Sequence, residues 1–469
     1  MNNALGKIKQ NKVIDTVKNV LSSKFFPFTT AALFLLCYYT ALDLLAIYYL
    51  AIVAILILLL LEDITPLIPQ LLFINLVVSL KNAPSLGTTD FYMRPEVLAQ
   101  AGAMFALAVC ALIYRVVLCI VKKQFKTSPV FYGLSAFCFV LLLNGVFNEH
   151  YTIKNFLFGL MLALCFLGIY VLIKNNIKAD KNCFEKVAYG FIALSALLLI
   201  QIIVAYATTE DLFVDGSIVR ERLVFGWGVY NTYGLMIMLC LPAATFLAGR
   251  EKHGYIFMVY SALIFTATIL SCSRQAMIGA IFIYPVCIII LLVKGKYRIP
   301  NLCITAAAVL AGIVLVCIFR EKVSESLAAI FENIIVDGEL NGSGRWRLWK
   351  ESLTYFSEFP IFGAGFFIER SYEAFELLNL VPLMCHNTVL QLMSSCGMVG
   401  LIFYTVHRVQ TVVCYCKNIT VERTFIALTI VIILMLSLGD MHIFNIFPTI
   451  IYSCLLAVLE KSQDKQKTV

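Results

Sequence analysis

Residues 44–61 read LLAIYYLAIVAILILLLL, a run without a single charged side chain. A helix needs about 20 mostly apolar residues to cross the hydrocarbon core of a bilayer, which is about 30 Å thick. A segment that is apolar on every side has no polar face to turn toward water. This stretch therefore predicts a helix that crosses a membrane.

Similar apolar runs recur along the whole chain of 469 residues. They predict an all-α polytopic bundle of about 12–14 transmembrane helices, so that residues 1–469 form a single integral membrane domain. Only Asp43 separates the first two runs, which could therefore be one long helix. The predicted spans lie near residues 25–42, 44–61, 64–80, 96–121, 130–147, 155–173, 187–207, 229–248, 255–272, 276–293, 301–319, 387–406, 424–439 and 443–460.

The composition and charge of the chain agree with this prediction. Hydrophobic residues make up 61% of the chain and charged residues 14%, whereas a soluble domain is roughly 45–50% apolar and about 25% charged. The net charge is +8. The basic residues lie in short loops between apolar runs, where they orient a membrane protein, and we therefore expect no nucleic-acid partner.

The loops differ in how many basic residues they carry. With the N-terminus inside, 23 lysines and arginines fall in the inner segments and 6 in the short outer loops. Cytoplasmic loops of membrane proteins carry such an excess, so we expect both termini in the cytoplasm. The lysine-rich start runs into apolar spans without the cleavage site of a signal peptide.

The sixteen cysteines of the chain do not indicate a disulfide framework. Nearly all lie in apolar runs or in segments assigned to the cytoplasm, and only Cys385 falls in the long outer segment. We interpret them as small apolar side chains that fill space between helices.

Residues 320–386 form the only long hydrophilic stretch and are rich in aromatic residues, including Trp346 and Trp349. Loops longer than about 15 residues are usually functional or disordered, and the aromatic content argues against disorder. A helix is expected between Ser343 as its N-cap and Pro360. The sequence therefore predicts one large structured extracytoplasmic loop.

Several short motifs in and around this loop share their spacing with a known family. They are Arg345 followed by Trp349, Pro360, Gly363-x-Gly365, His386-Asn387 and Gly397-x-x-Gly400, together with Arg220-x-Arg222 ahead of Asn231 and the pair Ser273-Arg274. The set, over about residues 225–440, resembles the O-antigen ligase family, which also includes O-antigen and capsule polymerases. One departure is Tyr230, where the family usually has proline.

The resemblance implies a metal-independent membrane glycosyltransferase that needs no cofactor. It would move an oligosaccharide or polysaccharide from undecaprenyl pyrophosphate to an acceptor in surface polysaccharide biosynthesis. The reaction would take place at the outer face of a bacterial cytoplasmic membrane. The acceptor is lipid A–core in ligases and another lipid-linked repeat unit in polymerases, and a glycan, lipid or protein acceptor fits this sequence equally well.

The residues of the motifs suit this chemistry. Loss of pyrophosphate from an anomeric carbon is helped by positive charge, which arginine supplies as a two-pronged donor. The outer arginines at membrane level are Arg220, Arg222, Arg274 and Arg345. His386 is the predicted base for the acceptor hydroxyl, since a helix N-terminus next to it favours neutral imidazole.

Other residues have weaker assignments. Asn387, Trp349, Gly363 and Gly365 are expected to support the site, and Asp440 with His442 lies at an outer helix end and could join it. Asp337 and Glu339 flank a glycine, a pattern more typical of solvated carboxylates than of metal ligands, so we predict no metal site.

Two other functions fit parts of the sequence. A repeat-unit polymerase of the same family would use the same chemistry on a different acceptor. A lipid-linked glycan flippase or other transporter would also need many spans, but it would not need the large outer loop.

Overall fold

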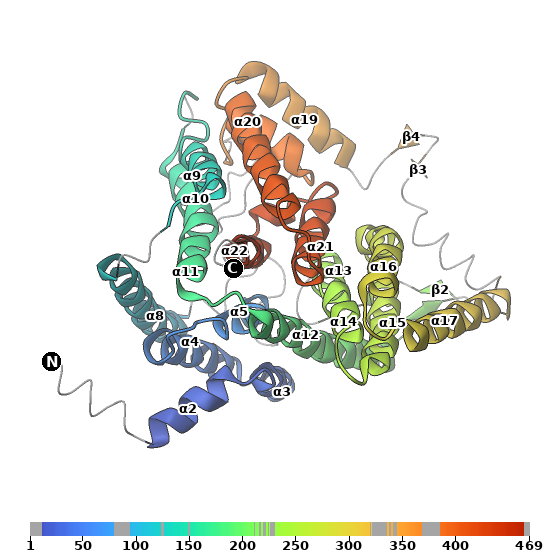
Figure 1. Ribbon diagram of the computed structural model, residues 1–469. Helices are drawn as coiled ribbons and strands as arrows, with labels where there is room; N and C mark the ends of the chain where they lie inside the picture. Colours follow the sequence, from blue (N-terminus) through green and yellow to red (C-terminus); the bar gives the residue numbers. More distant parts are fainter. Residues whose placement is uncertain are drawn as a thin grey trace.

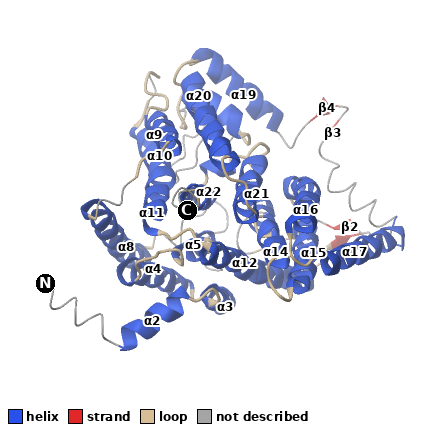
Figure 2. Cartoon of the chain, viewed as in Figure 1, coloured by secondary structure: helices blue, strands red, loops and turns tan. Residues whose placement is uncertain are grey.

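The structure of the protein is a computed structural model (Figures 1 and 2). It describes residues 12–78, 94–122, 126–148, 151–210, 212–214, 217–218, 222–223, 225, 230–318, 320, 335–336, 339–340, 345–367 and 385–463. These residues are helical apart from two short hairpins, β1 (Phe213–Val214) with β2 (Ser217–Ile218) and β3 (Ile335–Val336) with β4 (Glu339–Leu340). The predicted all-α polytopic fold is confirmed.

The N-terminal part shows where apolar runs break. Its helices are α2 (Lys12–Ser22), α3 (Phe26–Thr40), α4 (Asp43–Leu60), α5 (Leu67–Leu71), α6 (Ile74–Val78) and α8 (Pro95–Val121). The first two predicted spans are separate helices, because Ala41 ends α3 in the left-handed conformation with φ 57°. Residues 64–80 were expected as one span, but their described part forms α5 and α6. Phe73 N donates to Gln70 O (3.1 Å) in the tight turn between the two short helices.

The other helices follow the remaining predicted spans. They are α9 (Pro129–Leu142), α10 (Ile153–Ala163), the π-helix η1 (Leu164–Gly168), α11 (Ile169–Asn176), α12 (Lys181–Thr208), α13 (Tyr230–Met238), α14 (Leu241–Ala248), α15 (Gly254–Leu270), α16 (Arg274–Lys294), α17 (Arg298–Ile318), α19 (Arg345–Glu358), α20 (Thr388–Cys416), α21 (Val421–Leu436), the 3₁₀-helix η6 (His442–Phe444) and α22 (Ile446–Lys461). Five of these helices are capped at the N-terminus by the side chain of the residue directly before them: Ser128, Asp180, Ser273, Asn387 and Thr420.

The number of long spans is lower than the 12–14 expected. Among the described residues, seven helices are long and apolar enough to cross a membrane, or eight if α2 and α3, bent by 81°, count as one. The difference arises because several apolar runs form shorter helices, such as α9 and α15. The chain is nevertheless a multi-pass membrane protein.

Helix α22 lies inside the bundle, between α11, α20 and α21 (Figure 1). Every residue from Phe447 to Glu460 is buried. Near its end Glu460 accepts from Lys174 Nζ (2.6 Å) and from the hydroxyl of Tyr170, which neutralises the buried carboxylate. All sixteen cysteines are free thiols, as expected.

Helix directions bring several predicted residues to one end of the bundle. Helices α16 and α20 begin at the end where α21 finishes and η6 follows, and α19 lies along α20 at the same end (Figure 1). Residues at the termini of three separate helices can therefore lie close together at this end.

Candidate functional site

Helix α20 is interrupted at Gly397. Gly397 has φ 63° and ψ −160°, so the helical hydrogen-bond ladder stops there. The turn that follows α19 fills the gap: Ala364 N donates to Ser394 O (2.7 Å) and Met398 N donates to Pro360 O (2.8 Å). Backbone groups that the break would leave unpaired therefore have partners within the protein.

Two glycines allow this turn to approach α20. Gly363 has φ 71°, and a Cβ at this position would lie 2.3 Å from the carbonyl carbon of Ser395. Gly365 has φ 98°, and a Cβ there would collide with the side chain of Asn155. Both positions require glycine, since an L side chain is disfavoured at these φ values and has no room. Their role is to position the turn.

Helix α19 connects this turn to the residues around His386. Trp349 Nε1 donates to the carbonyl oxygen of Cys385 (3.0 Å), and Ser352 Oγ lies 2.6 Å from Cys385 Sγ. At the start of α19, Arg345 Nη1 donates to Gly439 O (2.6 Å). The helix therefore holds two chain segments at once, the one before α20 and the one after α21.

The segment before α20 lies along the segment after α21. Asn387 caps α20: its Oδ1 accepts from Val389 N (2.9 Å) and Leu390 N (3.1 Å). Its Nδ2 donates to Leu438 O (2.8 Å). His386, directly before the cap, has φ 48°. Such a conformation is strained for a residue other than glycine and persists where the surroundings enforce it, often at functional sites.

This arrangement brings His386 against Asp440. The imidazole Nδ1 lies 2.9 Å from Asp440 Oδ1, and the side chains of His386 and Asp440 are 29% and 13% exposed. Burial opposes the charge of Asp440, but the hydrogen bonds that its carboxylate accepts from His386 and from the backbone N–H of Met441 outweigh it and hold the pKa of this carboxyl well below its ordinary value. An ionised carboxylate only accepts hydrogen bonds, so Nδ1 donates to it, and in the neutral form of the ring Nε2 is then the acceptor.

Arg345 and His442 complete the electrostatic surroundings. His442 is buried in η6, and burial lowers the pKa of its imidazole; Asp440 opposes this shift, and the positive charge of Arg345 adds to it. His442 is therefore neutral near pH 7. Arg345, His386, Asp440 and His442 form one cluster, which we call the outer cluster after the side of the membrane that the sequence predicts for it.

The start of α16 reaches the same place. Gln275, directly after Arg274, donates through Nε2 to Gly439 O, the oxygen that also accepts from Arg345. Ser273 Oγ donates to Asn231 Oδ1 (3.1 Å) at the start of α13. The Ser273-Arg274 pair and Asn231, taken from separate motifs, are thus in contact. Arg274 is half-buried one residue from Gln275.

Two predicted arginines and two predicted carboxylates are not among the described contacts of this cluster. Arg222 is exposed, and the contacts described for the outer cluster do not include it. Arg220 and Asp337 lie outside the described residues, and Glu339 is placed only as part of β4. Among the residues that the structure describes, no group of three or more histidines, cysteines and carboxylates is arranged to hold a metal ion.

Sequence reasoning singled out His386 but only noted Asp440, and it missed Gln275 and Gly439. The position of Asp440 between two apolar spans was the available signal for its placement at the same end. The pairing itself depends on how α20 and α21 dock, which no local pattern specifies. Gln275 carried no signal beyond its place next to Arg274.

The outer cluster has the parts for acid–base chemistry on an anionic substrate. His386 provides a proton acceptor in a fixed tautomer, and Asp440 orients and stabilises the ring. Arg345 and, beside Gln275, Arg274 provide positive charge at the same end of the bundle.

Comparison with known proteins agrees with the geometry. Residues 259–405 match the family model Wzy_C, described as O-Antigen ligase. The match runs from α15 to the middle of α20 and includes Arg274, Arg345 and His386. A comparison with curated proteins finds no match. The chain is therefore a multi-pass membrane protein in which residues 259–405 form a Wzy_C O-antigen ligase domain.

Proposed function

We propose that the protein transfers an oligosaccharide or polysaccharide from undecaprenyl pyrophosphate to an acceptor hydroxyl at the outer face of the membrane. The observation that carries the proposal is the 2.9 Å contact between His386 and Asp440, with Arg345 bound to the adjacent residue Gly439. The family implies lipid-linked glycan substrates, and Arg345 and His386 of this cluster lie within the matched residues 259–405.

His386 acts as the general base. Its Nε2 accepts the proton of the acceptor hydroxyl as that oxygen forms a bond to the anomeric carbon of the donor sugar. The bond from the anomeric carbon to the pyrophosphate oxygen breaks, and its electron pair leaves with undecaprenyl pyrophosphate. Asp440 stabilises the imidazolium that forms and keeps Nδ1 as the protonated nitrogen throughout.

The arginines act on the leaving group. Arg345 uses one of its five N–H groups for Gly439 O, and the others are suited to bind phosphate oxygens side by side. Arg274 would add positive charge from the start of α16. Arg222 and Arg220 would contact the pyrophosphate of the donor when it binds. Positive charge at the pyrophosphate stabilises the transition state without a metal ion, so we propose metal-independent catalysis.

The test is a turnover assay with the purified full chain in lipid nanodiscs, with EDTA and an undecaprenyl-pyrophosphate-linked oligosaccharide. One arm supplies a second lipid-linked repeat unit and the other a lipid A–core acceptor, so that the productive arm identifies the reaction. Released undecaprenyl pyrophosphate reports bond cleavage. His386→Gln should lose about 10²–10⁴-fold of the rate while donor binding stays intact.

The matched control is His253→Gln, an exposed histidine before α15. It should turn over like the wild type. Equal turnover of His386→Gln and wild type would remove His386 as the base. Movement of the donor across the bilayer without release of undecaprenyl pyrophosphate would favour a flippase instead, and loss of wild-type turnover in EDTA would show that a metal is needed.

A further inference from the structure

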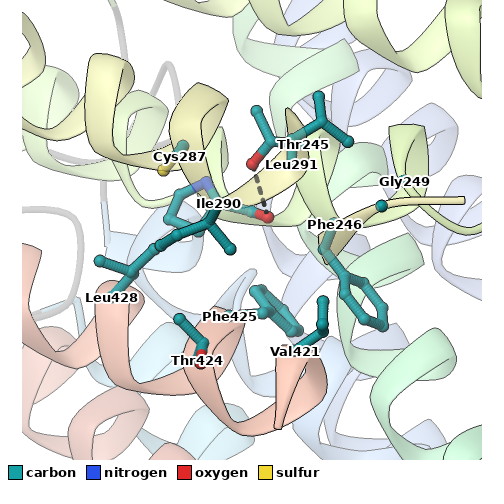
Figure 3. Close-up of a pocket in the computed structure, with 12 residues that line it drawn as sticks. Thr245, Phe246, Gly249, Cys287, Ile290, Leu291, Val421, Thr424, Phe425 and Leu428 are labelled. Carbon is teal, nitrogen blue, oxygen red and sulfur yellow. Dashed lines mark hydrogen bonds between the residues drawn. The ribbon is translucent and has the colours of Figure 1, made fainter. Parts of the chain in front are cut away.

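Two adjoining cavities lie at the end of the bundle opposite to the outer cluster. The first is a narrow crevice between α14, α16 and α21 (Figure 3), with about 330 Å³ of unfilled space, part of it open to solvent. The second has about 770 Å³ of unfilled space, also partly open to solvent, and is lined by the neighbouring ends of these helices and by the start of α12. Both are lined by Phe246, Gly249, Gly295 and Val421, so they adjoin each other.

The first cavity is apolar. Its lining includes Phe246, Ile290 and Leu428 from three different helices, and it contains no charged side chain. Its two threonine hydroxyls are already bonded within their own helices: Thr245 Oγ1 donates to Pro242 O (3.2 Å) and Thr424 Oγ1 donates to Thr420 O (2.7 Å). The cavity therefore offers a ligand hydrocarbon contact and little else.

The second cavity is charged. Three carboxylates of its lining are already paired: Arg250 binds Glu185 (3.0 Å) and Glu422 (2.9 Å), and Lys24 lies 3.4 Å from Glu251. The lining also contains Lys181, Lys294 and Lys296. Among the residues that the structure describes, these three lysines have no recorded ion pair. The mouth of the space therefore carries surplus positive charge.

The position of the space along the helices fits the edge of a bilayer. It lies where α16 ends at Lys294 and α21 begins at Val421, whereas the outer cluster lies at the opposite ends of both helices. A charged mouth at the ends of apolar helices corresponds to the headgroup level, and an apolar slot leading away from it corresponds to the acyl chains. Basic pockets between helix ends are typical sites for anionic lipids.

We propose that this space binds one anionic phospholipid. The phosphate of the headgroup contacts Lys181, Lys294 and Lys296, and the upper part of one acyl chain enters the slot between Phe246, Ile290 and Leu428. A free phosphate would contact only the lysines, and a neutral lipid would contact only the apolar slot. The lipid would tie α14, α16 and α21 together at the end opposite to catalysis.

The test compares lipid binding and thermal unfolding of the full chain. The protein, stripped of lipid in detergent, is titrated with phosphatidylglycerol and phosphatidylcholine of the same acyl chains, and separately with glycerol phosphate. Native mass spectrometry counts the bound lipid. We expect phosphatidylglycerol to bind about tenfold or more tightly than phosphatidylcholine, since each lysine near an anionic headgroup contributes about a fivefold gain. Glycerol phosphate should not raise the unfolding temperature.

Two pairs of variants test the headgroup contacts and the acyl-chain contacts separately. The triple variant Lys181→Gln, Lys294→Gln, Lys296→Gln should lose the preference for phosphatidylglycerol, while the control triple Lys178→Gln, Lys252→Gln, Lys417→Gln, at exposed lysines outside the cavity, should keep it.

Leu428→Trp should block the slot and weaken both lipids, whereas Val431→Trp, on the exposed side of the same helix, should not. Equal binding of the two lipids by the wild type would overturn the proposal without any variant. Full stabilisation by glycerol phosphate would reduce the site to an anion site, and unchanged binding by Leu428→Trp would exclude the slot.

Discussion

Asp440 Oδ1 lies 2.9 Å from Nδ1 of His386, although 54 residues separate the two in the sequence. The contact joins the residue before α20 to the turn after α21, and Arg345 and Asn387 each bind the backbone of that turn. The pair is therefore held by bonds on both sides. This relationship decides which tautomer His386 adopts and makes Asp440 a positioning residue for the proposed base.

Asp440→Asn should lower kcat by about 10²-fold or more with little change in KM, because an amide can donate to Nδ1 and place the proton on Nε2. Asp440→Glu should keep part of the rate, since it keeps the carboxylate. The measurement is the pH dependence of kcat and KM in the nanodisc assay. A wild-type pH profile and rate in Asp440→Asn would show that the pairing is only structural.

Arg345→Lys should reduce transfer about 10- to 100-fold although the charge is kept. A hydrogen bond to a charged group contributes about 1.5–3 kcal/mol, and lysine cannot make the paired contacts of a guanidinium. Arg347→Lys is the matched control, since Arg347 is exposed on the same helix. Initial rates of the two variants are compared at matched protein concentration. Equal rates of Arg345→Lys and Arg347→Lys would argue against pyrophosphate binding by Arg345.

Gly397→Ala should destabilise the protein by several kcal/mol. The residue has φ 63°, which costs an L-residue about 1–3 kcal/mol, and a Cβ would lie 2.3 Å from the carbonyl oxygen of Ile361. Gly312→Ala is the control, because its Cβ would meet nothing within 4 Å. Thermal unfolding in detergent, followed by intrinsic fluorescence, should show a lower midpoint for Gly397→Ala alone.

The stability of the protein should fall as the pH drops below about 6.5, where histidine of the unfolded chain takes up a proton. Burial lowers the pKa of His442 in the folded state, so the folded protein binds this proton later and loses up to about 1.4 kcal/mol per pH unit.

The lowered pKa of Asp440 affects stability in a different pH range. Its stabilising contribution is fully present above the unfolded pKa of about 3.9 and is lost only as the pH falls toward the folded pKa. Unfolding midpoints between pH 5 and 8 should therefore depend less on pH in His442→Gln than in the wild type. His253→Gln should follow the wild type. An unchanged slope in His442→Gln would contradict the assignment.

The orientation of the chain can be measured directly. In a background without native cysteines, a cysteine at position 347 should react with a membrane-impermeant maleimide from outside intact cells. A cysteine at position 178, which lies between α11 and α12, should react only after permeabilisation. Both positions are exposed. The reverse pattern would place the outer cluster away from the proposed donor.

The helices could be predicted from the sequence because a bilayer makes length and apolarity nearly sufficient. The break at Gly397 and the cap at Asn387 could also be predicted, since both depend on local backbone preferences. Helix length was less predictable. Residues 64–80 contain no charged residue and look like one span, yet their described part forms the two short helices α5 and α6, with Pro66 and Pro69 at the first of them.

The site was predictable in its residues more than in its contacts. His386, Arg345 and Trp349 carry a motif, and the structure brings them to the segments before α20 and after α21. The partners of these residues are backbone oxygens of Gly439 and Cys385 and the carboxylate of Asp440. Contacts of this kind follow from docking between distant segments, and backbone oxygens have no signature in the sequence.

The filled break in α20 also bears on how the protein is made. The turn between α19 and α20 bonds to α20 on one side and, on the other, to two earlier helix ends: Asn144 Oδ1 accepts from Phe366 N (3.2 Å) and Asn155 Oδ1 accepts from Phe367 N (2.8 Å). The ribosome delivers these asparagines more than 200 residues before the turn that needs them. During synthesis the early helices must therefore wait in the membrane with this surface uncovered. A nascent chain can complete this part of its fold only when α20 inserts.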